Sequence, residues 1–451
     1  MKKQKNDKIQ QIANKKRYNF KFLFMLVHLK TLGCRLNEAE LETWAESFQK
    51  SGHGITQVPE QARLIVINSC AVTQDAARKS RQLIRRIHRE NPSAKLIVSG
   101  CYATLNQEEA ESLLGVDLVI SNKDKNLLVE KALELIPNTM PAMSTEPAAV
   151  SLFTRGRQRA FVKVQDGCRY RCTFCIVTVA RGEESSRVID EVITEINSLH
   201  AQGIQEVVLT GVHLGGYGSD INSDLAELIA TILKQTEIPR LRLGSLEPWE
   251  LSEQFFELFE NPRLMPHLHL PLQSGSDTVL RRMARRCKTQ EFAEIVAKLR
   301  AKIPHFNITT DIIVGFPAES EQEWQDSYDF IKHIGFGHIH IFSYSKREGT
   351  KAATLANQIS EPIKKQRSQA LHSLANQLKH EFYNANLGKI FPVLWEGQKE
   401  DLGNGKQRVF GYTPNYLRVA CDVDAGVNLE NQTLNTRLIE VGQGFILGEL
   451  C

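Results

Sequence analysis

The sequence predicts an α/β protein with three parts: an amino-terminal doubly wound parallel sheet, a central partial (βα)6 barrel and a small carboxy-terminal β-barrel. Two observations lead to this prediction. Apolar, extended runs alternate with helix-like stretches from residue 25 to residue 387, and short β-type runs split by Gly, Asn and Asp follow. With 451 residues, the chain is also about three times as long as a domain of roughly 150 residues.

The composition is that of an ordinary globular protein. Hydrophobic residues make up 42% of the chain and charged residues 24%, which argues against a fibrous or mainly disordered protein. The formal net charge of +4 permits a nucleic-acid partner without requiring one. No apolar run of about 18 residues occurs, so we expect no membrane span and a cytoplasmic location.

Residues 1–24 form a Lys-rich segment that leads into a short apolar run, as a secretion signal does. The apolar run is too short and Lys30 interrupts it, and Thr31 stands where a lipoprotein signal has a large aliphatic residue. We therefore expect residues 1–24 to be a dispensable basic tail, or translation to begin at Met25.

Residues 25–137 are predicted to form the first domain. The expected strands are Met25–Cys34, Arg63–Cys70, Lys95–Cys101 and Asp117–Ile120, with helices at Glu38–Ser51, Asp75–Arg89 and Lys125–Leu135. Three of these strands end in a cysteine. Right-handed crossovers place the ends of parallel strands on one edge of a sheet, so Cys34, Cys70 and Cys101 (the amino-terminal triad) should converge there as metal ligands. The alternative is three core residues, since free cysteine is often buried.

The second domain is predicted over residues 154–387, after a linker at 138–153 that is rich in Pro, Met, Thr and Ser. Its expected strands are Ala160–Val164, Glu206–Leu209, Arg240–Gly244, His267–Leu272, Ile308–Val314 and His338–Phe342. Helical patterns such as Val188–His200 and Phe292–Lys302 separate them. Six strand–helix units suggest an open, partial barrel with its active site at the carboxyl ends of the strands.

After a helical stretch at Pro362–Leu387, residues 388–451 are predicted to form a small β-domain. The expected strands are Ile390–Trp395, Arg408–Tyr412, Tyr416–Ala420 and Leu434–Val441.

The strongest chemical signal is a group of three cysteines placed directly after a predicted strand, Cys168, Cys172 and Cys175 (the loop triad). Three thiolates at this C-x3-C-x2-C spacing can bind three irons of a four-iron cluster and leave the fourth iron free for the methionine part of S-adenosylmethionine (SAM). A structural zinc site and coincidental thiols are the alternatives. Zinc usually takes a fourth protein ligand from a second Cys or His pair, and none follows nearby. Nine cysteines spread over a long chain also argue against a disulfide scaffold.

The loop-triad spacing, with Phe174 before the last cysteine, resembles the radical SAM superfamily. Other segments are similar to its methylthiotransferase family. They are Thr31–Cys34 with Asn37, Asn68–Cys70 and Ser99–Ala103 for the amino-terminal domain, Pro271–Ser276 and Asp311–Pro317 for the barrel, and residues 388–451 for the RNA-binding TRAM domain. The resemblance covers nearly everything from Met25 to Cys451.

Within that family, Arg35, Thr73, Thr210–His213 and Gly411–Tyr416 most resemble the MtaB-type branch. That branch methylthiolates N6-threonylcarbamoyladenosine beside the tRNA anticodon, at tRNA position 37. The branch that modifies a ribosomal-protein aspartate normally has Pro where Arg35 stands, and the isopentenyladenosine branch tends to differ at Arg35 and Thr73. Both substrates remain alternatives. An iron–sulfur RNA-binding or sensor protein is the alternative from a different class.

The resemblance implies two four-iron clusters, SAM, tRNA, a reducing electron donor and a sulfur source. The amino-terminal triad would hold an auxiliary cluster that carries or donates the sulfur, and the cluster on the loop triad would cleave SAM. The 5′-deoxyadenosyl radical would take hydrogen from adenine C2, and a second SAM would supply the methyl group. No role is implied for Cys287, Cys421 or Cys451.

The resemblance also suggests residues that contact SAM at the barrel rim: Phe174, Gly211, Ser245, Glu247, Gln273 and Gly315. For the glycines the alternative is a tight turn, and for Glu247 it is a helix cap before Pro248.

Basic clusters at 78–89 and 281–288 suggest phosphate contacts, although solvated helix faces are the alternative. Aromatic residues of the last domain could stack on unpaired bases or simply pack in its core. The candidate RNA contacts are Arg81, Arg85, Tyr412, Tyr416 and Arg418.

Overall fold

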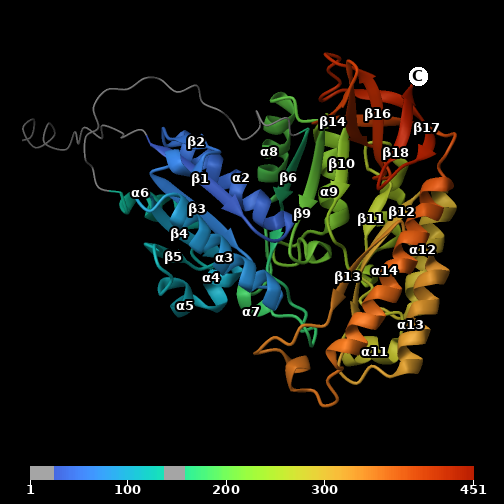
Figure 1. Ribbon diagram of the computed structural model, residues 1–451. Coiled ribbons are helices and arrows are strands. Elements are labelled where there is room, and N and C mark those ends of the chain that lie inside the picture. The colour runs from blue at the N-terminus through green and yellow to red at the C-terminus, as the bar shows by residue number, and fades with distance from the viewer. Residues whose placement is uncertain (1–24, 137–157) are drawn as a thin grey trace, which may run out of the picture.

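The computed structural model describes residues 25–136 and 158–451, which fold around three successive sheet systems (Figure 1). The predicted basic tail, and the predicted linker at 138–153, lie outside the described residues. None of the helices in the described ranges combines the length and the apolar character needed to cross a bilayer. The three predicted parts occur in the expected order.

The amino-terminal sheet is parallel, with the strand order β2-β1-β3-β4-β5. Its strands are β1 Leu26–Thr31, β2 Gly54–Thr56, β3 Leu64–Ser69, β4 Lys95–Gly100 and β5 Leu118–Ile120. This 2-1-3-4-5 order is one of the two common doubly wound orders, so the predicted fold is confirmed. The edge strand β2 was missed because three residues carry too little pattern to be recognised.

Helices cover both faces of this sheet. They are α2 Arg35–Lys50, α3 Gln74–Glu90, α4 Cys101–Leu105, α5 Gln107–Glu111 and α6 Leu128–Glu134. Trp44 and Phe48 of α2 pack with Leu128 of α6 on one face. Leu83 and Ile84 of α3 pack on the other face. The helix α2 begins at Arg35 rather than at the predicted Glu38, because Cys34 ends the strand segment and serves as the helix N-cap.

The central domain is a six-stranded partial barrel built from two parallel three-stranded sheets, β10-β9-β6 and β11-β12-β13. Single bridges, Leu241 to Leu264 and Ser245 to His269, connect the two sheets. The strands are β6 Arg159–Lys163, β9 Glu206–Thr210, β10 Arg240–Leu243, β11 His267–His269, β12 Asn307–Val314 and β13 His338–Ser343. The helices are α7 Val177–Arg181, α8 Ile189–Ala201, α9 Leu225–Gln235, α10 Glu253–Glu257, α11 Asp277–Arg282, α12 Thr289–Lys302, α13 Glu321–Ile334 and α14 Glu361–Asn384.

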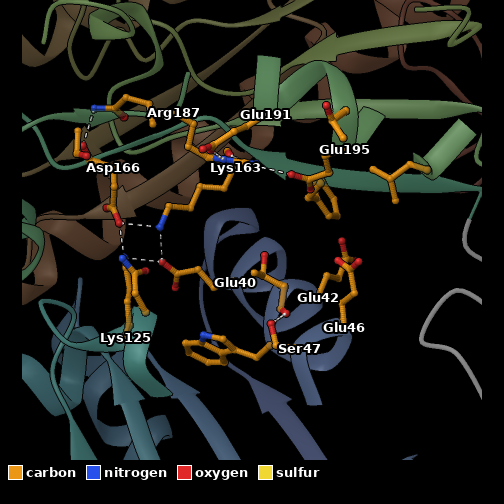
Figure 2. Close-up of a pocket in the computed structure, with 18 of the residues that line it drawn as sticks. Glu40, Glu42, Glu46, Ser47, Lys125, Lys163, Asp166, Arg187, Glu191 and Glu195 are labelled. Atoms are coloured by element: carbon orange, nitrogen blue, oxygen red, sulfur yellow. Dashed lines mark hydrogen bonds and ion pairs between the residues drawn. The ribbon is translucent and has the colours of Figure 1, made fainter. Parts of the chain in front are cut away.

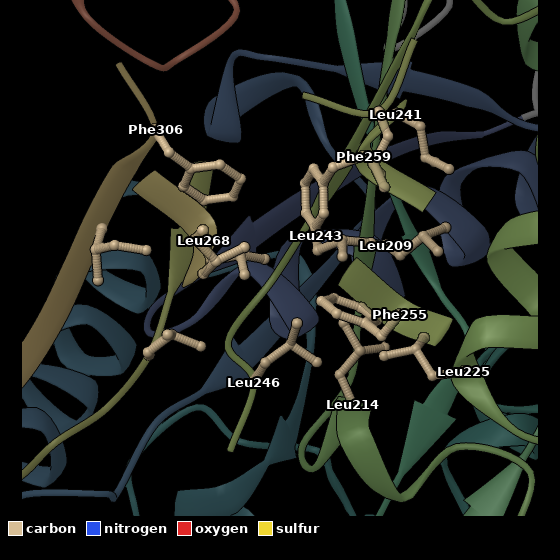
Figure 3. Close-up of a cluster of buried hydrophobic side chains, with 14 of the residues drawn as sticks. Leu209, Leu214, Leu225, Leu241, Leu243, Leu246, Phe255, Phe259, Leu268 and Phe306 are labelled. Carbon is tan, nitrogen blue, oxygen red and sulfur yellow. The ribbon is translucent and has the colours of Figure 1, made fainter. Parts of the chain in front are cut away.

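The core of this domain lies between the strands and the outer helices. Figure 3 shows its centre, where Leu209 and Leu243 of neighbouring strands meet Phe255 and Phe259. A short two-stranded ribbon, β7 Gln165–Asp166 and β8 Ser185–Ser186, continues from β6. The apolar residues thus fill the outer layer and leave the inner face of the strands to larger polar side chains.

The carboxy-terminal domain is a closed barrel, as predicted, but it has five strands in the order β14-β15-β16-β18-β17, and the last strand of the chain was not predicted. Its strands are β14 Ile390–Gly403, β15 Lys406–Tyr412, β16 Arg418–Asp424, β17 Thr433–Val441 and β18 Ile446–Leu450. The predicted strand Tyr416–Ala420 starts too early. Tyr416 has a left-handed backbone (φ 65°) and ends a turn in which its N–H donates to the Thr413 carbonyl at 3.0 Å.

The turn 413–417 docks on the amino ends of the barrel strands. Arg242 donates to the Pro414 carbonyl at 3.1 Å, and Asn307 donates to the Asn415 carbonyl at 2.9 Å. Asn415 in turn donates to the His305 carbonyl at 3.0 Å. The carboxy-terminal domain therefore closes one end of the central barrel and leaves the carboxyl ends of its strands, where the cysteines lie, uncovered.

Candidate active site

The loop triad follows β6 and β7 and is held by a turn that requires glycine. Gly167 has a φ of 71°, and a Cβ there would lie 1.8 Å from the Glu183 carbonyl oxygen. The Cys168 N–H donates to the Gly182 carbonyl at 3.2 Å, and the Cys175 N–H donates to the Cys172 carbonyl at 3.0 Å. Backbone contacts thus wind this short loop into a compact shape with its thiols on the inside.

The three thiols of the loop triad are close enough to influence one another. Burial raises the pKa of Cys168 to about 12, and the charges of Cys175 and Cys172 push it in the same direction. Burial likewise raises the pKa of Cys175 to about 11. None of the three forms a disulfide. Half-buried thiols gathered in one loop fit the thiolate ligand set of an iron–sulfur cluster, because a bound cation offsets the cost of their negative charge.

Hydrogen bonds from His213 to two carboxylates support the loop that carries the loop triad. Its Nε2 lies 2.6 Å from Glu250, its Nδ1 contacts Glu184, and Tyr170 of the loop donates to Glu250 at 2.7 Å. Burial alone would lower the pKa of His213, but the two carboxylates raise it. Since both ring nitrogens are occupied, this histidine has no lone pair for a metal. The close group of Cys168, Glu184 and His213 is therefore a hydrogen-bonded support and does not supply the fourth ligand of a zinc site.

Gly211 supports the same loop indirectly. A Cβ at Gly211 would lie 2.8 Å from the Gln165 side-chain oxygen, so a larger residue there would push that side chain aside. The Gln165 amide donates to the Gly167 carbonyl at 2.9 Å and its oxygen accepts from the His213 N–H at 2.8 Å. The sequence singled out Gly211 as a SAM contact, and the structure gives it a packing role as well.

Arg285 stands beside the loop triad and changes two sequence-based interpretations. It donates to Glu247 at 2.9 Å and lies 4.0 Å from the Cys172 sulfur, and its side chain is only 3% exposed. The prediction that Arg285 belongs to a phosphate-binding cluster is therefore wrong. Glu247 does occupy the N-cap position before the short 3-10 helix Pro248–Glu250, but its side chain makes no capping hydrogen bond and pairs with Arg285 instead.

The amino-terminal triad converges at the carboxyl edge of the first sheet. Cys34 follows β1, Cys70 follows β3 and Cys101 begins α4 after β4. Burial raises the pKa of Cys70 to about 11, with a further contribution from the charges of Cys101 and Cys34. Cys34 remains accessible to water, yet the surrounding protein also raises its pKa while Arg181 opposes the rise. The three sulfurs are therefore neighbours, although distant segments supply them.

The two triads lie next to a pair of helices, α4 and α7, that contact each other. Helix α4 starts at Cys101, and α7 starts two residues after Cys175. Asn122 joins the two sides, since its side-chain amide donates to the Ala180 carbonyl at 2.8 Å and lies 3.8 Å from the Cys101 sulfur. Two three-thiol groups thus lie on opposite sides of one interdomain contact.

Arg181, the last residue of α7, adds a second link to the amino-terminal domain, through α2 rather than α4. Its guanidinium donates to Glu40 at 2.9 Å and to Asn37 at 2.8 Å, and it pairs with Asp166 at 3.2 Å. Lys125 adds a bond to Glu40 at 2.7 Å, and Figure 2 shows Lys125, Lys163, Glu40 and Asp166 as one cycle of contacts. Burial would raise the pKa of Glu40, but Arg181 and the two lysines lower it to about 2. This buried network had no signal in the sequence.

A groove of about 1060 Å³ opens outward from this network, between α2 and α8. Glu42 and Glu46 line one wall and Glu191 and Glu195 the other (Figure 2). Lys50 pairs with Glu46, and Arg187 pairs with Glu191 and Glu195, so the walls of the groove carry charges of both signs.

Comparisons with known proteins agree with this geometry. The model of the uncharacterized protein family UPF0004 matches residues 26–121, and that of the Radical SAM superfamily matches residues 162–331. The threonylcarbamoyladenosine tRNA methylthiotransferase MtaB of Bacillus subtilis is 36% identical over 405 residues, covering 87% of this chain and 89% of that protein. The chain belongs to the MtaB-type methylthiotransferases of the radical SAM superfamily.

Two further relatives set the limits of this assignment. The tRNA-2-methylthio-N(6)-dimethylallyladenosine synthase of a Wolbachia strain from Brugia malayi is 30% identical, covering 94% of this chain and 98% of that protein. The radical SAM methyltransferase TsrM of Kitasatospora setae has a TM-score of 0.56 at 15% identity, covering 73% of this chain and 77% of that one. The second likeness concerns the fold alone. Radical SAM membership implies an iron–sulfur cluster and SAM for the methylthiotransferase.

The remaining SAM candidates of the methylthiotransferase lie at or next to the carboxyl ends of the barrel strands. Ser245 is exposed after β10, and Gln273 after β11 has a left-handed backbone (φ 73°), a strained conformation that often marks functional sites. Phe174 packs against the small buried cluster that contains Phe316. Gly315 has a φ of 71° and a Cβ there would lie 2.5 Å from Lys364, so a tight turn explains this glycine.

The RNA candidates fall into two groups. Tyr412 and Tyr416 stack on each other at 4.9 Å, and the Arg159 guanidinium lies over both rings. These contacts match the packing alternative, and base stacking stays a prediction.

The three arginine candidates differ in how far protein partners engage them. Arg418 lies 4.3 Å over Phe410. Arg81 pairs with Glu109 at 3.4 Å, whereas Arg85 is exposed on α3. Of the three, Arg85 is the side chain best placed to meet a phosphate from solvent.

Proposed function

We propose that this protein converts N6-threonylcarbamoyladenosine at tRNA position 37, beside the anticodon, to its 2-methylthio derivative. The observation that carries the proposal is the placement of two cysteine triads on opposite sides of the α4–α7 contact, in a chain that is 36% identical over 405 residues to the threonylcarbamoyladenosine tRNA methylthiotransferase MtaB of Bacillus subtilis. One triad alone would account for SAM cleavage. A second suggests a separate sulfur-bearing centre.

In this proposal the loop triad holds the radical SAM cluster and the amino-terminal triad holds an auxiliary four-iron cluster. When bound, the clusters and SAM supply a radical that can remove hydrogen from adenine C2, and the sulfur and methyl group that replace it. The protein itself orients these groups. Arg181, Glu40 and Asn122 fix the distance between the triads, and His213 keeps the cysteine loop rigid.

SAM binding is assigned to the barrel rim, where Ser245, Glu247 and Gln273 offer polar groups next to Gly211, Gly315 and Phe174. RNA binding is assigned to Arg81 and Arg85 of α3 and to Tyr412, Tyr416 and Arg418 of the carboxy-terminal barrel, which we take as a TRAM-like domain. The enzyme would act in the cytoplasm, with a reducing electron donor and a sulfur source as further partners.

Nucleoside mass spectrometry of tRNA from a deletion strain tests the proposal. We expect the 2-methylthio-threonylcarbamoyl nucleoside to disappear and its unthiolated precursor to accumulate. Loss of the methylthio-isopentenyl nucleoside instead would move the chain to the related substrate, and an unchanged profile would refute both. Anaerobic reconstitution should give about eight irons per chain, whereas about four would argue against the auxiliary cluster.

A further inference from the structure

The inner face of the central barrel is polar, and one arginine from the amino-terminal domain reaches into it. The Arg35 guanidinium lies 5.8 Å from the ring centres of both Phe161 and Tyr416 and donates to the Tyr416 hydroxyl at 3.3 Å. Phe161 belongs to β6, and Tyr416 belongs to the turn that closes the amino end of the barrel. Arg35 therefore lies inside the barrel, although it is the first residue of α2.

Arg35 differs from the other arginines of this interior in having no acidic partner. Arg242 pairs with both oxygens of Glu206 at 3.1 Å, and Arg159 pairs with Glu206 and Glu396. Within the described ranges, no carboxylate oxygen lies within 4 Å of the Arg35 guanidinium. A half-buried guanidinium held between aromatic rings keeps its planar fork of N–H donors available for a carboxylate.

The groups around Arg35 are mostly neutral. His340 on β13 and His267 on β11 both have a lowered pKa, mainly through burial, and the positive charge of Arg35 lowers them further. Asp311 on β12 pairs with His269 at 3.2 Å. One imidazole nitrogen of His340 lies within 4.8 Å of the His269 and Asp311 ligand atoms, so these side chains form a compact set of hydrogen-bonding groups. The interior thus combines one unpaired positive charge with neutral donors and acceptors.

Arg35 also directly follows Cys34, so the Cα atoms of the two residues are about 3.8 Å apart. On adenine, the C2 and C6 carbons are both bonded to N1. A substituent on the C6 amino group is therefore close to C2, and a residue that binds this substituent has to stand next to the groups that serve C2. The neighbours Cys34 and Arg35 meet this requirement.

We propose that Arg35 binds the carboxylate of the threonyl group of the substrate base, and that His340 and the His269–Asp311 pair bind the hydroxyl and urea groups of the same substituent. This inference rests on the proposed function and adds its specificity determinant. An isopentenyl group offers no anion and would leave the Arg35 charge unpaired. The threonylcarbamoyl group carries a carboxylate, which can pair with the Arg35 guanidinium.

The test compares two synthetic anticodon stem-loops, one with threonylcarbamoyladenosine and one with its methyl ester, which keeps the shape but removes the charge. Binding to the reconstituted full-length protein is measured by fluorescence anisotropy without reductant, so the result does not depend on turnover. For the unsubstituted protein we expect the free acid to bind about 10- to 100-fold more tightly than the ester. Equal binding of the two RNAs would overturn the inference.

Variants at position 35 locate the effect. Arg35→Gln and Arg35→Met should bind the free acid as weakly as the ester, while Arg35→Lys should keep part of the preference because it keeps the charge. Iron content and thermal unfolding verify that Cys34 and the fold are intact. A variant that loses affinity for both stem-loops equally would assign Arg35 a structural role and refute the inference.

Arg85→Gln is the matched control, because this arginine is exposed on α3 outside the barrel. It should weaken binding of both stem-loops by the same factor and leave the preference intact. Product analysis distinguishes failure of the proposed function from failure of the proposed role of Arg35. If the unsubstituted protein does not methylthiolate the free-acid RNA, the proposed function fails. If it does, and Arg35→Gln keeps the preference, only the role of Arg35 fails.

Discussion

The two cysteine triads reach similar arrangements by different routes. The loop triad lies within one short loop. Its shape depends on local turns, on the backbone of Gly167 and on the hydrogen bonds of His213. The amino-terminal triad depends on three strand ends that only the order of the parallel sheet brings together. The loop triad is therefore positioned by one short segment of the chain. The amino-terminal triad is positioned by the fold of a whole domain and by its contact with Arg181.

The largest effect should follow from a change in the loop triad. Cys172→Ala should abolish 5′-deoxyadenosine formation and methylthiolation together, with losses of about 1,000-fold or more, because neither step has another source of the radical. Liquid chromatography of reduced, SAM-containing reactions measures both products. Cys287→Ala is the control, because Cys287 is buried outside both triads and should retain activity. Continued SAM cleavage by Cys172→Ala would remove the loop triad from the mechanism.

A change in the amino-terminal triad should separate the two reactions. Cys70→Ala should stop methylthiolation but leave 5′-deoxyadenosine formation measurable, with about half of the iron lost on reconstitution. Cys421→Ala, a buried thiol of the carboxy-terminal barrel, is the matched control. If Cys70→Ala keeps full iron content and methylthiolation, these cysteines are core residues, as the alternative interpretation holds.

The contact between the two sites should be sensitive to Glu40. Glu40→Gln leaves Arg181, Lys125 and Lys163 sharing Asp166 alone, which should cost about 3 kcal/mol of unfolding free energy. The lowered pKa of Glu40 also sets a direction with pH. The carboxylate stabilises the fold above its unfolded pKa of about 4.3, and this contribution is lost as the pH falls toward about 2.

Urea unfolding at pH 7 and at pH 3 measures both effects of Glu40. The difference between Glu40→Gln and the unsubstituted protein should shrink at the lower pH. Glu46→Gln on the same helix removes only an exposed pair with Lys50 and should change stability by less than about 0.5 kcal/mol. If Glu40→Gln and Glu46→Gln changed the free energy of unfolding equally, the buried network would stabilise the fold no more than an exposed ion pair does.

The smallest effect is expected at His213. His213→Gln should reduce SAM cleavage about 10-fold by loosening the Tyr170 loop, with the iron content nearly unchanged. The raised pKa of His213 means that the protonated ring stabilises the fold below its unfolded pKa of about 6.5, and that this contribution fades as the pH rises through the folded value. Thermal unfolding from pH 6 to pH 9 should show this slope, and His213→Gln should remove it. His333→Gln is the control, because His333 is exposed and its substitution should leave this pH dependence unchanged.

Sequence patterns were sufficient where the information is local. The alternation of apolar, extended runs with helix-like stretches, and the short β-type runs after Gly388, led to the fold class, which the structure confirms. Element ends were less certain, because Tyr416 looks like a strand residue until its left-handed turn is seen. Arg285 looked like a phosphate ligand because a row of basic residues gives no hint that one of them is buried against Glu247.

The sequence by itself determined which groups can do chemistry here: six cysteines in two sets, the order of strands and helices, and the family. Only the tertiary structure decided how the sets meet, through the α4–α7 contact and the charges that Arg181 and Glu40 share. It also decided that Arg35 contacts Tyr416 in the barrel interior and pairs with no acid of residues 25–136 and 158–451. The physical reason is that hydrophobic periodicity and thiol spacing act along the chain, whereas charge pairing depends on distances that folding alone creates.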